Sequence, residues 1–75
     1  MDRALIREHL AFAEQQLDAA DEHLAKQRAI VAQIERNKLD ASLARKLLRL
    51  FEDGYALHVL HCDRLRAELD GAEQD

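Results

Sequence analysis

The first half of the chain carries apolar residues at alternating spacings of three and four. These positions hold Ile6, Leu10, Ala13, Leu17, Ala20, Leu24, Gln27, Val31 and Ile34, of which only Gln27 is polar. An apolar row of this period is typical of a helix that packs along a nearly aligned neighbour. The row therefore predicts one long helix over about residues 2–36.

Residues beside this row widen the apolar stripe. We expect Leu5, Phe12 and Ala19 to border the row on one side, and His9, Gln16, His23 and Ile30 to border it on the other. A stripe this wide suits a helix bundle better than a two-stranded coiled coil.

The segment 37–40 predicts a turn. Asn37 is suited to a left-handed C-cap, and Asp40 is placed to cap the next helix. Two helices joined by so short a turn run antiparallel. The second helix is expected over about residues 41–70, with Gly71 as its C-cap and a frayed tail over 71–75. Gly54 leaves open whether this helix is continuous or a third helix starts near Tyr55.

The second helix has two apolar stripes. One face is expected to hold Leu43, Leu47, Leu50, Phe51, Gly54, Leu57, His58, His61 and Leu65. Leu48, Tyr55, Val59 and Cys62 form the other stripe, and the segment 54–62 carries no acidic or basic residue other than histidine. One neighbouring helix cannot cover such a circumference, which predicts a second protomer or another protein partner.

The fold class expected is therefore all-α. Residues 1–75 form a single antiparallel two-helix hairpin that assembles as a homodimer into a four-helix bundle. The residues expected in the interface are Leu10, Leu17, Leu24, Gln27, Val31, Leu47, Phe51, Tyr55, Leu57 and Val59.

Length, charge and cysteine content support a partner and limit its kind. A chain of 75 residues buries little core of its own, and its single cysteine, Cys62, cannot form an internal disulfide. We expect a cytoplasmic protein with no signal peptide and no membrane span. The net charge of −4, with basic residues dispersed among acidic ones, disfavours nucleic acid as a partner.

Histidines offer the main alternative to an interaction role. Folding the hairpin sets Leu17 near Leu60 or His61 and His23 near Gly54, so that His23, His58 and His61 could bind a metal or small ligand. The chain has neither a Cys-x-x-Cys nor a Glu-x-x-His motif. We therefore expect no metal or cofactor, and histidines that donate hydrogen bonds in a partly polar interface or face water. Histidines at a protomer contact would weaken that contact when protonated.

Four further residues have structural interpretations. Gln16 and Gln27 could fix helix register if buried, and have no special role if exposed. Cys62 is expected to be a small buried apolar residue rather than a reactive thiol. Ser42 lies where a helix begins, and the chain carries no phosphate loop or nucleophile motif, so we expect no enzyme activity.

Nearly the whole chain resembles short bacterial proteins, chiefly alphaproteobacterial, that are helical hairpins of unassigned function. The resemblance is carried by His9-Leu10, Ala13-Glu14, His23, Gln27-Arg28, Val31, Ile34-Glu35, Asp40, Ala44, Leu47-Leu48, Phe51-Glu52, Leu57-His58 and Asp63-Arg64-Leu65. It implies a bacterial, cytosolic protein and supplies no activity. The function expected is thus a small helical oligomerisation or protein-protein interaction module. The alternative is a metal- or ligand-binding bundle.

Overall fold

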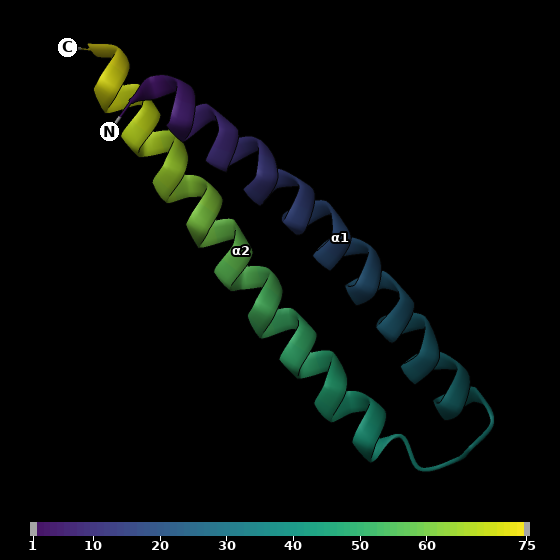
Figure 1. The fold of residues 1–75 in the computed structure, drawn as a ribbon. Coiled ribbons are helices and arrows are strands. Elements are labelled where there is room, and N and C mark those ends of the chain that lie inside the picture. The colour runs from purple at the N-terminus through teal and green to yellow at the C-terminus, as the bar shows by residue number, and fades with distance from the viewer. Residues whose placement is uncertain (1, 75) are drawn as a thin grey trace.

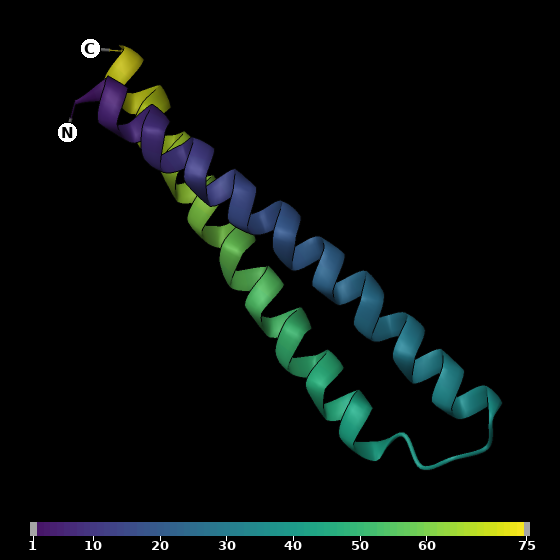
Figure 2. The same ribbon diagram turned by 45° about the vertical axis from the view of Figure 1, so that its right-hand side comes forward.

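The protein folds as two long helices lying side by side. A computed structural model describes residues 2–74, with side chains through residue 71. Helix α1 spans Arg3–Arg36 and α2 spans Ser42–Gln74. They run antiparallel, with both ends of the chain at one end of the hairpin and the turn at the other (Figures 1 and 2). The all-α hairpin expected from the sequence is confirmed, as a rod measuring 58 × 14 × 13 Å.

Helix α1 ends in a tight hydrogen-bonded turn. The Leu39 N–H donates to the Ile34 carbonyl at 3.1 Å, and the Lys38 N–H donates to the Glu35 carbonyl at 3.0 Å. This pair of bonds is the Schellman motif, which needs a left-handed residue directly after the C-cap. Lys38 is that residue, with φ 56°, whereas Asn37 has φ −83°. The left-handed conformation expected at Asn37 therefore lies one residue later.

Helix α2 begins one residue later than the sequence suggested. Asp40 precedes the buried Ala41, whose carbonyl accepts the first helical bond from the Arg45 N–H at 2.8 Å. The Asp40 carboxylate still stabilises the helix start, because it accepts hydrogen bonds from both the hydroxyl and the backbone N–H of Ser42. These bonds hold the pKa of Asp40 below its ordinary value.

The apolar row of α1 faces α2 along its whole length. All nine positions of the row are buried or half-buried, while every other residue of α1 is exposed. This row, residues 6 to 34 at three-four spacing, is hereafter the α1 seam.

The row of α2 that faces α1 takes residues from both apolar stripes of that helix. The α2 seam consists of the partly exposed Phe51 and the buried or half-buried Ala41, Ala44, Leu48, Tyr55, His58, Cys62, Leu65 and Leu69. Gly54 and Val59 are also half-buried, one on each side of this seam. Leu43, Leu47, Leu50 and Leu57 are exposed instead. The two rows differ in how far they stay apolar along α2. Continuing the leucine row at the same spacing leads to Arg64 and Glu68, whereas the α2 seam continues with Cys62, Leu65 and Leu69 opposite the first turns of α1.

Neither glycine interrupts α2. The helix runs unbroken through Gly54, and it continues through Gly71 to Gln74 instead of ending at Gly71. Neither glycine has a positive φ, so the backbone conformation at both positions is compatible with a helix. Of the tail expected to fray, residue 75 lies outside the described residues.

Two sets of contacts fix how the helices are aligned. Near the chain ends, Ala13 packs with Cys62 and Leu65 in a buried cluster, against which Leu10 and Leu17 lie. Nearer the turn, the buried side-chain amide of Gln27 donates to the Ala44 carbonyl at 2.9 Å. Gln27 is 7% exposed, so the interpretation of a buried polar residue that fixes register applies to it.

Candidate protein-interaction face

The two long sides of the hairpin have different chemistry. In an antiparallel helix pair, the residues flanking the seam on one side of each helix share one face, and those on the other side share the opposite face. On one face the rings of His23 and Phe51 meet, with centroids 6.4 Å apart and planes tilted by 40°. On the other, Asp21, Arg28 and Glu52 line a shallow hollow with the edges of Leu24 and Tyr55. The hairpin therefore has an apolar face and a charged face.

The apolar face gathers most of the exposed large hydrophobic residues. It consists of Leu5, Phe12, Ile30, Leu43, Leu47, Leu50, Phe51 and Leu57. Phe12, Leu50 and Leu57 are 63%, 64% and 67% exposed. Among residues 2–71, the two remaining exposed large hydrophobic residues lie elsewhere, Leu39 in the turn and Leu60 on the outer edge of α2.

The residues between these apolar side chains are mostly uncharged. The positions next to the seams on this face hold His9, Gln16, His23 and Ile30 in α1, and Leu47, Gly54 and His61 in α2. The row of Leu5, Phe12 and Ala19 lies beside that of His9, Gln16 and His23, so the two rows expected on opposite sides of the α1 seam are on the same side. Basic and acidic residues on this face are Arg64 and Glu68 toward the chain ends, and Lys26, which is one turn before Ile30 in α1.

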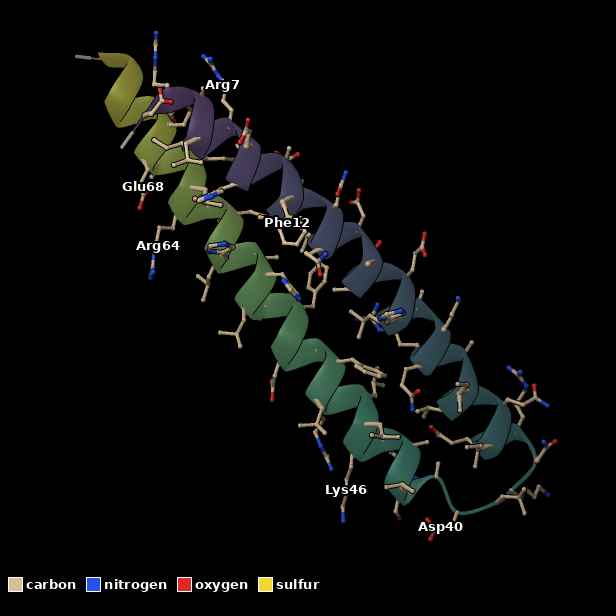
Figure 3. All side chains as sticks on the ribbon, in the orientation of Figure 1. Arg7, Phe12, Asp40, Lys46, Arg64 and Glu68 are labelled. Atoms are coloured by element: carbon tan, nitrogen blue, oxygen red, sulfur yellow. The ribbon has the colours of Figure 1, made fainter. Side chains whose placement is uncertain are left out.

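The charged face and the outer edges carry the opposite composition. Residues flanking the seams on the charged face are Arg7, Glu14, Asp21, Arg28 and Glu35 in α1, and Arg45, Glu52, Val59 and Arg66 in α2. The Arg66 guanidinium lies 3.3 Å from the Asp63 carboxylate, one turn earlier in α2. In Figure 3, Arg7 points away from α2, and Lys46 points away from α1.

The hairpin exposes more surface than a compact protein of its mass. Its accessible surface is 5702 Å², against about 4,700 Å² expected for a folded chain of 8.6 kDa. Its radius of gyration is 17.0 Å, against about 11 Å for a compact 75-residue domain. The rod thus leaves about 1,000 Å² of surface that a globular fold would bury.

The interface residues expected from the sequence divide between the seams and the outer faces. Leu10, Leu17, Leu24, Gln27, Val31 and Tyr55 belong to the seams within the hairpin. Leu47 and Leu57 lie on the apolar face, Phe51 lies at its border with 39% exposure, and Val59 is half-buried beside the charged face. Leu5, Phe12, Ile30, Leu43 and Leu50 were absent from that set. Extending both apolar rows of α2 to the end of the helix would have identified the outward one.

The histidines occupy different environments. His23 lies against Phe51, one turn before Gly54, close to the position expected. His58 is half-buried in the α2 seam, while His61 is exposed on the apolar face. Among residues 2–71, no three His, Cys, Asp or Glu side chains come together in a group that could hold a metal ion. Cys62 is a free, buried cysteine.

Comparisons with known proteins add no relative. No family model, curated protein or solved structure matches the chain. Over the described residues, neither helix has an apolar stretch long enough to cross a membrane.

Proposed function

We propose that this protein is a small cytoplasmic oligomerisation module whose apolar face docks against the same face of a second copy. The assembly is a homodimeric four-helix bundle, held together without cofactor or catalytic activity. The observation that carries the proposal is the position of the exposed hydrophobic residues, eight of which share one face built from both helices.

The amount of exposed surface supports a partner of this size. A standard protein-protein interface removes about 800 Å² from each partner. This is close to the excess of about 1,000 Å² that the rod exposes relative to a compact chain of the same mass. A second hairpin laid along the face would cover leucine and phenylalanine side chains and leave the charged faces of both copies in water.

The composition of the face also favours a protein partner. Two of its three charged residues, Arg64 and Glu68, lie toward one end, where an interface has its polar rim, and its middle carries histidine, glutamine and glycine among the leucines. A nucleic acid would need a basic surface, whereas the charged face alternates acidic and basic residues.

The test compares two leucines of α2 that differ only in direction. Leu50 lies on the apolar face with 64% exposure, and Leu60 lies on the outer edge with 63% exposure. Each is replaced by glutamate, and the mass in solution is measured by size-exclusion chromatography with light scattering. Burying a leucine stabilises an interface by about 1.5–3 kcal/mol, and a two-fold dimer contains two copies of it. Leu50→Glu should therefore raise the dimer Kd at least about 100-fold.

Leu60→Glu should leave the dimer intact and serves as the matched control. This face would be excluded as the interface if the Leu50→Glu variant remained a dimer, or if both variants dissociated to the same extent. A wild-type chain that is monomeric at micromolar concentration would overturn the homodimer. In that case the apolar face would need a partner of another sequence.

A further inference from the structure

Nothing within the hairpin requires a glycine at position 54. It lies in the middle of α2, on the apolar face, with Leu50 and Leu57 one turn away on either side. A Cβ atom added there would meet nothing within 4 Å, and the backbone does not have a positive φ. A glycine in the middle of a helix weakens it relative to alanine. The close approach of another chain to the helix at this point would account for the cost.

The row of α2 on the apolar face, in which Gly54 is half-buried and the other members are exposed, is self-complementary when it is paired with a reversed copy of itself. The row consists of Leu43, Leu47, Leu50, Gly54, Leu57 and His61, at spacings of four, three, four, three and four. These spacings read the same in both directions, so an antiparallel copy brings every position opposite another position of the row. Leu47 then lies opposite Leu57 of the partner subunit, and Leu50 lies opposite Gly54 of the partner subunit.

On the basis of the proposed function, we infer that the second copy docks α2 against α2, antiparallel, with the Leu50 side chain of each chain seated on Gly54 of the other. The two-fold axis passes between residues 50 and 54, so one contact is made twice, as a two-fold dimer requires. The missing side chain at Gly54 leaves room for the leucine and lets the two backbones approach closely. A side chain seated in this way between residues of the facing helix is typical of knobs-into-holes packing between nearly aligned helices.

The alternative pairing of α2 with the partner's α1 fits the apolar rows less well. At matched height along the two hairpins, the α1 side of the face offers Lys26, Ile30 and Gln33 near the turn, where α2 carries Leu43, Leu47 and Leu50. Only Ile30 of these three is apolar, so the leucines would lie partly against a charged and an amide side chain. Pairing α2 with α2 places leucine against leucine or glycine, with His61 opposite Leu43 at the ends of the row.

The test uses the opposite effects of one methyl group on the hairpin and on the dimer. Gly54→Ala improves helix propensity, and the lone hairpin has room for the methyl, so the hairpin itself should not lose stability. At a close helix contact, the same methyl displaces the leucine of the partner. Sedimentation equilibrium should then show a dimer Kd raised about tenfold or more. Gly71→Ala is the matched control, because Gly71 is also helical and open but lies beyond the row.

A second measurement locates the pairing directly. Chains carrying Leu47→Cys and chains carrying Leu57→Cys are mixed, both in a Cys62→Ala background, and oxidised. The proposed pairing predicts a disulfide between the two kinds of chain, and little cross-linking of either variant alone, because a disulfide needs Cα atoms within about 7 Å.

These outcomes separate the inference from the proposed function. If the wild-type chain is a dimer but Gly54→Ala binds as tightly as Gly71→Ala, the docking at Gly54 is wrong and the homodimer stands. Cross-links of Leu47→Cys to itself, rather than to Leu57→Cys, would likewise reject the reversed pairing alone. A monomeric wild-type chain would reject both.

Discussion

The buried Gln27 provides a direct test of how the hairpin is held in register. Its side chain is 7% exposed and donates a hydrogen bond of 2.9 Å to the Ala44 carbonyl. Gln27→Ala removes this bond, which contributes about 1 kcal/mol, and leaves unfilled space beside it, which costs about 1 kcal/mol more. We expect unfolding to become easier by about 2 kcal/mol, which for a domain of this size lowers Tm by roughly 8–16 °C.

The cost is limited because the acceptor does not lose its last partner. Ala44 lies in the first turn of α2, where its carbonyl also accepts the helical bond from the N–H four residues later. Gln27→Met, which keeps the shape of the side chain and loses only the hydrogen bond, should therefore cost about 1 kcal/mol or less. The two variants together separate the hydrogen bond from the packing.

The assay is urea unfolding followed by far-UV circular dichroism, at one fixed protein concentration so that any association contributes equally. The matched control is Gln15→Ala, because Gln15 is exposed on the side of α1 opposite the seam. That variant should change the free energy of unfolding by no more than about 0.5 kcal/mol. If Gln27→Ala were as mild as Gln15→Ala, the buried amide would have no role in alignment and the reasoning would be refuted.

Three other predictions concern the turn and the core. Lys38→Gly should stabilise the protein by about 0.5–1 kcal/mol, seen as a higher urea midpoint, because Lys38 has φ 56° and glycine adopts that conformation without strain; an unchanged or lower midpoint would contradict this. Asp40→Ala should lower Tm at neutral pH. Because hydrogen bonds from Ser42 lower the pKa of Asp40 in the folded protein, its contribution is present above the unfolded value of 3.8 and is lost as the pH falls through the folded pKa. The Tm difference between Asp40→Ala and wild type should shrink over that acid range, and a constant difference would disprove the role of the charge. Cys62 is 0% exposed, so a thiol reagent should label it slowly in native protein and rapidly in urea, whereas immediate native labelling would show that the core near the chain ends is open.

Much of the fold could be predicted because α1 has a single apolar row that reaches from one end to the other. Each position of that row, from Ile6 to Ile34, is buried or half-buried as its spacing predicts. Only one arrangement of α1 removes this row from water, so its direction toward α2 follows from hydrophobic burial alone.

The packing face of α2 was harder to predict, because this helix carries two apolar rows, either of which could face α1. The choice between them depends on the far end of the helix, where Leu65 and Leu69 continue one row and Arg64 and Glu68 end the other. The interaction face was therefore only partly predictable, since a leucine such as Leu50 is equally apolar in either arrangement. Its exposure follows from which row α1 covers.

Details of the turn depend on backbone geometry that residue preferences do not determine. Asparagine adopts the left-handed conformation more readily than lysine, yet Asn37 occupies the C-cap and Lys38 takes the positive φ. Ala41, directly before α2, is 0% exposed, so packing restricts where the turn can end. Tertiary packing thus overrides the local preference.

The central claim is that the apolar face is covered by a second copy of this chain. Sedimentation equilibrium of the unmodified protein at neutral pH and micromolar concentration tests it most directly, because the measured mass does not depend on molecular shape. The account predicts a mass of twice the 8.6 kDa of one chain. A stable, cooperatively folding species with the mass of a single chain throughout that concentration range would contradict it.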